Sequence, residues 1–190
     1  MKNNLYSEVK MELQKAIQDR VSVRNYDPDK KVRKEEIEKL IESAIQAPSW
    51  KNSQTARYHI IMNEDKMIEF RDKCLPLFNQ KNCENASALI ITSFVKNSSG
   101  FERATGEPSN EVGNGWGFYD LGLHNENLLL KAVDLGLDSL VMGIRNESMI
   151  REMLNIDSSE IIVSVIAIGY ALKKTDKPKR KVVSDIATFY

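Results

Sequence analysis

The chain has 190 residues, a length compatible with one domain that buries a sizeable hydrophobic core. Its 27 Lys and Arg residues balance 27 Asp and Glu residues, so no broad positive field favours binding to nucleic acid or to an anionic membrane. The N-terminus is charged where a signal peptide needs an apolar run, and no stretch reaches the ~18 apolar residues of a membrane span. We therefore expect a cytoplasmic protein whose partners are small molecules or protein chains.

The first half of the chain predicts three helices and one strand. The predicted helices cover residues 4–19, 34–46 and 63–78, and the predicted strand covers residues 57–62. Asn63 is a suitable cap for the third helix. Pro48 should close the second helix, and Pro76 should kink the third helix or end it early.

The second half predicts three further strands and a long apolar helix. The strands are expected at residues 88–95, 140–142 and 160–170, and the helices at 118–135 and 147–154. Because the first of these helices is apolar on most faces, it should be buried, in the core and in a subunit contact together. Gly136 should end it. Strands that alternate with helices indicate an α/β or an α+β class.

Two segments have no regular pattern of their own. Residues 96–117 are rich in glycine and lack periodicity, which is typical of a mobile functional loop. Residues 171–190 are basic and then β-like over 181–186, yet no partner strand lies nearby in the sequence. This tail could be an arm that pairs with another subunit.

A short basic segment, from Arg20 to Tyr26, follows the first predicted helix. It places Arg20, Ser22 and Arg24 at alternate positions, so in an extended chain their side chains point to one side. Guanidinium groups and a hydroxyl form a suitable cradle for a phosphate. The alternative is a helix that ends in solvated basic residues, which the helix dipole favours.

Several familiar reaction classes find no support in the sequence. No phosphate loop or nucleophile elbow is present, and the glycines from Gly113 to Gly117 have the wrong spacing for a dinucleotide fingerprint. His59 and His124 stand apart without a metal-ligand cluster, and Cys74 and Cys83 lack a surrounding motif, so we expect structural histidines and packed thiols. A binding apparatus without an obvious acid, base or nucleophile is typical of an enzyme whose cofactor carries the reaction.

The segment that follows the second helix makes the interpretation more specific. It reads Ala-Pro-Ser from Ala47 to Ser49, and then Asn52 and Gln54. With the earlier Arg-x-Ser-x-Arg segment, this order resembles the opening of the FMN-dependent nitroreductase family, and the resemblance covers nearly all of the chain. It implies one α+β domain over residues 1–190, an α/β/α sandwich with a central, mostly antiparallel sheet flanked by helices. It also implies bound FMN, NADH or NADPH as co-substrate, no metal, and a homodimer that exchanges the C-terminal arm 171–190.

The resemblance assigns FMN-binding roles to residues that match the family motifs. They are Arg20, Ser22, Arg24, Pro48, Ser49, Asn52, Gln54, Asn79, Leu140, Val141, Met142, Gly143 and Arg180. The arginines and Ser22 face the phosphate and the pyrimidine edge of the flavin, the Pro48–Gln54 segment comes from the other subunit, and Gly143 allows close approach to the reactive ring nitrogen. Larger members place a Lys two positions before the terminal Arg, whereas Pro178 stands there, so Lys179 or Lys181 could substitute. For Asn79, an ordinary helix-end amide is an equal alternative.

The sequence leaves the substrate open. Trp116 and Phe118 stand at the exit of the 96–117 loop, where an aromatic ring could border a pocket for a planar acceptor. The alternative is that both rings anchor the start of the long helix. We expect hydride transfer from NADH or NADPH through FMN to a nitroaromatic, a quinone or a similar acceptor. A flavin carrier without turnover, a plain interaction protein, and a dehalogenase or flavin-fragmenting enzyme on the same scaffold are the alternatives.

Overall fold

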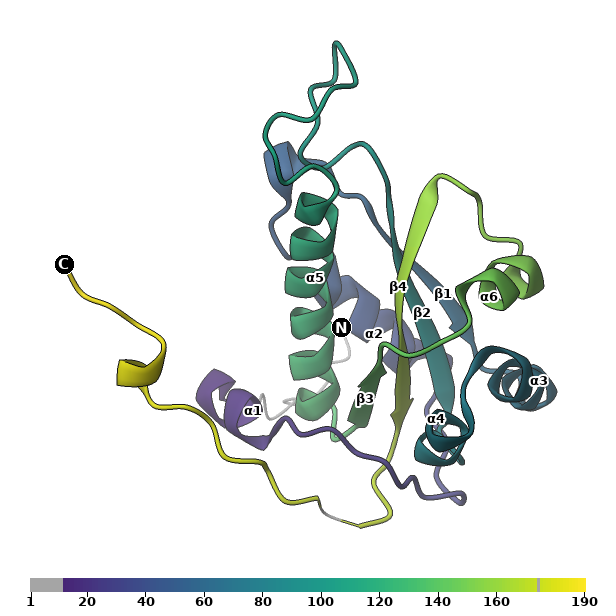
Figure 1. Cartoon of the computed structure of the whole chain (residues 1–190). Helices are drawn as coiled ribbons and strands as arrows, with labels where there is room; N and C mark the ends of the chain where they lie inside the picture. The colour runs from purple at the N-terminus through teal and green to yellow at the C-terminus, as the bar shows by residue number, and fades with distance from the viewer. Residues whose placement is uncertain (1–11, 174) are drawn as a thin grey trace, which may run out of the picture.

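The computed structural model describes residues 12–173 and 175–190, which fold into helices packed on both faces of one sheet (Figure 1). The helices are α1 (Leu13–Asp19), α2 (Lys34–Ala44), α3 (Glu64–Cys74), α4 (Leu77–Asn82), α5 (Gly115–Asp134) and α6 (Glu147–Leu154). The strands are β1 (Ala56–Ile61), β2 (Ala88–Val95), β3 (Asp138–Met142) and β4 (Glu160–Gly169). Two short 3-10 turns, η1 (Trp50–Asn52) and η2 (Val183–Asp185), complete the elements.

The sheet is antiparallel throughout, in the order β1-β2-β4-β3. Strand β2 pairs with neighbours on both sides, and its residues from Ala88 to Phe94 are all buried. This burial explains why β2 is an almost continuous apolar run rather than an alternating one. The predicted sandwich with a mostly antiparallel central sheet is therefore confirmed.

Two hydrophobic clusters hold the helices against the sheet. On one face, Phe70 of α3 and Ile150 of α6 pack with Ile91 of β2. On the other face, Leu40 of α2 and Leu128 of α5 pack with β-strand residues such as Ile90. Figure 1 shows α5 and α2 on one side of the sheet and α3, α4 and α6 on the other. Alternate residues of one strand thus serve two cores, as the period of a strand requires.

The helix ends follow local sequence signals. The Asn63 side chain caps α3 by accepting a hydrogen bond from Lys66 N at 2.9 Å, and α3 ends at Cys74, ahead of Pro76. After α5, Gly136 adopts φ of 70°, and Leu137 N donates to Ala132 O at 2.8 Å. This arrangement satisfies carbonyl groups at the helix end, and a glycine adopts it without strain. The predicted ends of both helices are confirmed.

Among the boundaries that differ from the predictions are those of helices α1, α2 and α5. Residues 4–11 of the first predicted helix lie outside the described residues, and the described helix begins at Leu13. Helix α2 ends at Ala44, two residues before the predicted end. Helix α5 begins at Gly115, three residues before the prediction, because Gly117 allows the helix to approach the Phe94 ring; a Cβ at this glycine would lie 2.2 Å from that ring.

The predicted β-like structure over residues 181–186 is wrong. The described tail contains the 3-10 turn η2 at this place, and residues 175–190 are all exposed. A strand needs a neighbour to receive its hydrogen bonds, and Figure 1 shows the tail extending away from the sheet.

The described residues contain no helix with the length and apolar character needed to cross a membrane.

Candidate functional site

The basic segment after α1 is extended and lies beside β3. Ser22 forms a parallel bridge with Ser139, and Val23 N donates to Ser139 O at 2.9 Å. Val21 and Val23 pack against the hydrophobic core. Because side chains alternate along an extended chain, the three polar residues between and beside these valines face away from that core. The geometry agrees with the predicted alternation.

The two arginines of the segment have different surroundings. The Arg20 side chain is only 18% exposed, and its Nε lies 4.0 Å from a carboxylate oxygen of Glu126 on α5. Arg24 is exposed and donates to Ser22 O at 3.4 Å. This weak contact leaves most of the Arg24 donors available on the surface. Both guanidinium groups are therefore held near β3 without a close, buried counter-ion.

The second predicted segment, Leu140–Gly143, forms the end of β3 and the turn after it. Leu140 and Met142 are buried, whereas Val141 is 45% exposed. Around Gly143 the space is open, since a Cβ there would meet nothing within 4 Å. Asn79 is buried and donates through Nδ2 to Ile144 O at 2.9 Å. This amide thus anchors the turn from the inside, which agrees with the structural alternative for this residue.

The segment Pro48–Gln54 is wound tightly at the other end of α5. Lys51, Asn52 and Gln54 all have positive φ, at 45°, 54° and 50°. Each non-glycine residue in this region costs of the order of 1–3 kcal/mol, and such strain gathers at functional sites. Ser49 Oγ compensates in part by accepting a hydrogen bond from Gln54 N at 3.0 Å.

A buried carboxylate fixes this segment to α5. The Asp120 side chain accepts hydrogen bonds from Trp50 N, at 3.0 Å, and from Ser99 Oγ. The sequence reasoning gave Asp120 no role; the available signal was an acidic residue on an otherwise apolar helix face. Three polar atoms of the neighbourhood, Trp50 Nε1, Ser53 Oγ and Thr55 Oγ1, are buried without a hydrogen-bond partner in the described part of the chain. Buried polar atoms without a partner are rare in folded proteins. This region therefore has donors and acceptors that contacts among the described residues do not use.

The structure brings some predicted segments together and separates others. The Arg20–Arg24 segment joins β3, which follows the end of α5, whereas Pro48–Gln54 is tied to Asp120 near the start of α5. Asp134, the last residue of α5, lies 14 positions after Asp120, which corresponds to about 21 Å along a helix. Within one chain, the two groups of predicted flavin contacts are therefore far apart.

The two aromatic residues at the start of α5 play different roles. Trp116 Nε1 donates to Asn110 Oδ1 at 3.0 Å, and its ring packs against Trp50 with centroids 4.6 Å apart. These contacts agree with the anchoring alternative for Trp116. Phe118 is 47% exposed, makes an edge contact with Phe94 at 4.9 Å, and lines a cavity.

The tail approaches the basic segment through a residue that the sequence analysis missed. Lys177 Nζ donates to Ile17 O at 2.8 Å and to Gln18 O at 2.7 Å, in the last turn of α1. A lysine is well suited to the carbonyl end of a helix, and a basic residue just before Pro178 was the available signal. Arg180 is exposed and donates to Pro178 O at 3.0 Å, so in a single chain it binds only its own backbone.

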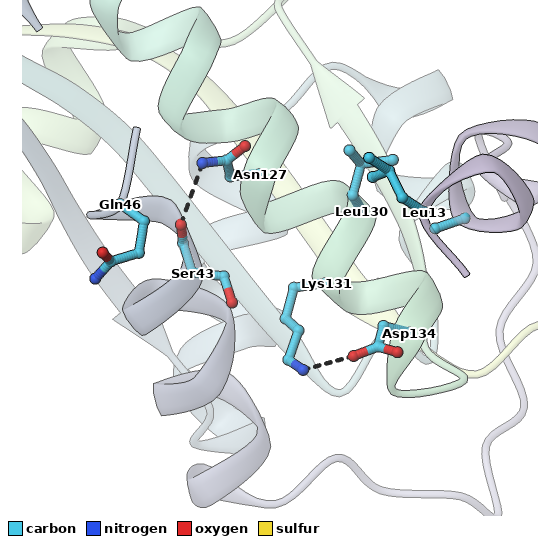
Figure 2. Close-up of a pocket in the computed structure, with 8 residues that line it drawn as sticks. Leu13, Ser43, Gln46, Asn127, Leu130, Lys131 and Asp134 are labelled. Carbon is cyan, nitrogen blue, oxygen red and sulfur yellow. Dashed lines mark hydrogen bonds and ion pairs between the residues drawn. The ribbon is translucent and has the colours of Figure 1, made fainter. Parts of the chain in front are cut away.

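A separate cavity of about 450 Å³ lies between α1, α2 and α5 (Figure 2). Its apolar wall includes Leu13 and Leu130, which Figure 2 shows approaching each other from α1 and α5. The Asn127 amide donates to Ser43 O at 3.3 Å across its rim. None of the predicted site residues lines this cavity.

The histidines and cysteines have structural contacts. His59 Nε2 lies 2.8 Å from a Glu160 carboxylate oxygen, and His124 Nδ1 lies 2.8 Å from Asp120 O. Burial raises the pKa of the Cys74 and Cys83 thiols to about 11, so both stay protonated at neutral pH. Residues 12–173 and 175–190 contain no group of three or more His, Cys, Asp or Glu side chains that could hold a metal ion.

Comparisons with known proteins agree on one family. The family model described as "Nitroreductase family" matches residues 17–170. A protein of Archaeoglobus fulgidus, provisionally named NADH dehydrogenase/NAD(P)H nitroreductase, is 31% identical over 166 residues, which cover 85% of this chain and 87% of the relative. Protein DrgA of Synechocystis sp. is 31% identical over 174 residues, 81% of each chain.

The solved structures show the same fold. A protein from Staphylococcus epidermidis, provisionally titled an NAD(P)H:FMN oxidoreductase, has a TM-score of 0.82 at 19% identity and covers 96% of this chain and 98% of its own. The match of the family model to most of the chain, together with two relatives at 31% identity over most of their lengths, leads to one conclusion. The chain belongs to the nitroreductase family of oxidoreductases.

Proposed function

We propose that the protein is an FMN-dependent oxidoreductase that takes hydride from NADH or NADPH and passes it to a nitroaromatic, a quinone or a similar small acceptor. The resemblance of the sequence motifs to the family supports FMN as the cofactor. The name of the Archaeoglobus relative, which includes NAD(P)H, supports a nicotinamide as the hydride donor. The site supports this class because it offers binding groups for a cofactor while its histidines and cysteines are engaged in structural contacts.

The observation that carries the proposal is the spacing along β3. Ser22 pairs with Ser139 at the start of β3, and Gly143 follows its end. Four residues of strand span about 13 Å, so an extended cofactor can place an anionic group at one end and a planar ring at the other. The exposed Val141 and the open space at Gly143 leave this edge accessible.

The chemistry of the donor groups fits FMN. Arg20 and Ser22 would hold the phosphate, because a guanidinium and a hydroxyl both donate to phosphate oxygens. Arg24 would lie by the pyrimidine edge, where a fixed positive charge favours the anionic reduced ring. When bound, FMN supplies the two-electron hydride chemistry. The chain's own part is to bind, to orient the ring against the turn at Gly143, and to keep that turn rigid through Asn79.

We propose that a second copy completes each site. Because Pro48–Gln54 lies at the far end of α5, it reaches a flavin on β3 only from another chain. The buried polar atoms without partners in and beside that segment are consistent with an unfinished surface. The contact would include Leu13, which lines the cavity of Figure 2 and is 68% exposed, and Ile17 on the same helix, which is 45% exposed. Large apolar interfaces are typical of obligate dimers.

The same reasoning gives the tail a partner. Val182, Val183, Ile186, Phe189 and Tyr190 are between 61% and 115% exposed in the single chain. Strand β1 pairs only with β2 among the described strands, so its outer edge is open. An exchanged arm that covers a partner's surface would bury these side chains and supply the basic residues of 177–181 near a flavin phosphate.

The first experiment is the flavin content of the purified protein. We expect a yellow protein with one FMN per chain that NADH or NADPH bleaches rapidly in a stopped-flow instrument. A colourless protein that takes up no added FMN would refute the proposal. Bound FMN that no nicotinamide reduces would identify a flavin carrier instead.

The second experiment removes residues 181–190. We expect this truncation to weaken both the dimer and FMN binding, measured by analytical ultracentrifugation and by flavin titration. The matched control is Lys66→Gln, an exposed change on α3. A truncated chain that stays dimeric with full flavin occupancy would rule out the exchanged arm while leaving the flavin proposal intact.

A further inference from the structure

A second cavity, of about 440 Å³, lies beside the start of β4, and we call it the Arg145 cavity. Its lining includes Lys96, Phe118, Arg145, Glu147, Arg151 and Glu160. It adjoins the turn after β3, because Arg145 Nη1 donates to Gly143 O at 3.1 Å. A volume of this size is within the range of small-molecule pockets.

The carboxylates of this cavity are already engaged. Glu147 accepts a hydrogen bond from Arg151 Nη2 at 2.6 Å. Glu160 lies 2.8 Å from His59 Nε2 and also accepts from Ser93 Oγ. Hydrogen bonds therefore hold both carboxylates in place, and the lining carries three cations, Lys96, Arg145 and Arg151, against these two carboxylates.

Two cations of the cavity form no ion pair among the described residues, although the charge of Glu147 acts on Arg145 and that of Lys96 acts on Asp157. Among the described residues, neither Lys96 nor Arg145 has a carboxylate oxygen within 4.0 Å. Arg145 donates to the carbonyls of Gly143 and Ile162, and its Nε is buried without any acceptor. Burial lowers the pKa of this guanidinium, because the charged form loses hydration and the nearby negative charge of Glu147 offsets that loss only in part. A bound anion would restore the balance of charge.

An aromatic face lies at the same cavity. Phe118 is 47% exposed although its ring edge contacts Phe94. Planar groups pack favourably against such a ring. The cavity thus combines an excess of positive charge, a buried guanidinium nitrogen without an acceptor, an exposed ring and contact with the turn at Gly143.

Building on the function proposed above, we propose that the Arg145 cavity binds the phosphate or carboxylate group of a substrate, with Arg145 and Lys96 as its positive partners and Phe118 against its planar part. The anionic group belongs either to the nicotinamide substrate, as the extra phosphate that distinguishes NADPH from NADH, or to an acidic acceptor. Both sources offer the same oxygen acceptors to a guanidinium.

The kinetic test compares charged and neutral members of each substrate pair. Lys96→Gln and Arg145→Gln should raise KM about tenfold or more, as expected for a lost bond to a charged group, for NADPH or for 4-nitrobenzoate. In Lys96→Gln the KM for NADH and for nitrobenzene, and the flavin content, should stay unchanged. Because Arg145→Gln also loses the bond to Gly143 O, it is judged by the ratio of its KM values for the charged and the neutral member of each pair. Lys66→Gln, which removes the same charge from α3, is the control. The substrate pair in which only the charged member shows a raised KM identifies the source of the anion. Equal increases in KM for the charged and the neutral substrates, or no increase, would overturn the proposal.

A binding test does not depend on turnover. Benzoate, compared with chloride at the same ionic strength, should raise the melting temperature of the wild-type protein and of Lys66→Gln, because a ligand stabilises the state that it binds. The increase should disappear in Lys96→Gln and in Arg145→Gln. Because the Lys96 side chain is exposed, its replacement should not disturb the fold. A retained increase in both variants would overturn the proposal. If the wild-type protein shows no turnover, the proposed function fails and this measurement alone decides on the cavity.

Discussion

Replacing Gly117 by Ala tests the contact that positions the start of α5. An added Cβ would lie 2.2, 2.3 and 2.9 Å from atoms of the Phe94 ring, which is fully buried. Overpacking of this kind costs about 1–3 kcal/mol, and displacement of the ring would also weaken its edge contact with Phe118, worth about 0.5–1.5 kcal/mol. The gain in helix propensity from Gly to Ala returns about 1 kcal/mol. We therefore expect a net loss of about 0.5–3.5 kcal/mol in the free energy of unfolding.

The same helix provides a matched control. At Gly122 a Cβ would meet nothing within 4 Å, so Gly122→Ala should gain helix propensity alone and stabilise by up to about 1 kcal/mol. Urea unfolding of both variants, followed by tryptophan fluorescence at one protein concentration, measures the difference. In a chain of this size each kcal/mol shifts Tm by about 2–4 °C. If Gly117→Ala proves as stable as Gly122→Ala, the close approach of α5 to Phe94 is wrong.

Three further predictions concern the described residues. Asn63→Ala should lower the free energy of unfolding by about 1 kcal/mol in urea, because the cap on Lys66 N is lost; an unchanged midpoint would contradict the cap. At pH 8, Ellman's reagent should modify the folded protein ~100-fold more slowly than the urea-unfolded chain. The reason is that burial raises the pKa of Cys74 and Cys83 from 9.0 to about 11, and each pKa unit lowers the thiolate fraction about tenfold. Similar rates would show that the thiols are not buried. Lys51→Gly should be neutral or stabilising by up to ~1 kcal/mol, because glycine adopts the left-handed conformation without strain, whereas the control Glu38→Gly inside α2 should cost about 1 kcal/mol; equal losses would contradict the strained turn.

The elements that the sequence predicted well are those with local causes. Strand β2 and helix α6 have the predicted bounds, because an uninterrupted apolar run and an amphipathic run are both visible in short windows. The start of α5 was missed, since Gly115 and Gly117 suggested a loop. Only the fold shows that the second of these glycines makes room for Phe94.

The candidate site was predictable in its parts and not in its assembly. The alternation of Arg20, Ser22 and Arg24 follows from the extended chain, and the valines between them confirm which side faces the core. The left-handed turn at Lys51 and Asn52 contains no glycine, so no local signal announced it. The relation of this turn to β3 depends on the length of α5 and, in the proposed dimer, on contacts with a second chain; short-range patterns encode neither.

The two edges of the sheet differ in how far other residues cover their backbone groups, and this difference affects the tendency to aggregate. Strand β3 pairs with β4 only from Val165 to Gly169, yet beyond it Arg145 and Arg151 donate to the carbonyls of Ile162 and Glu160. On strand β1, Arg57 Nη1 donates to Ala56 O at 2.8 Å at the start of the strand, whereas Ile60 further along it is 42% exposed. Open apolar strand edges recruit further strands from other molecules. A chain from which residues 181–190 are removed should therefore self-associate through β1 more strongly than the full-length chain, and its light scattering should rise.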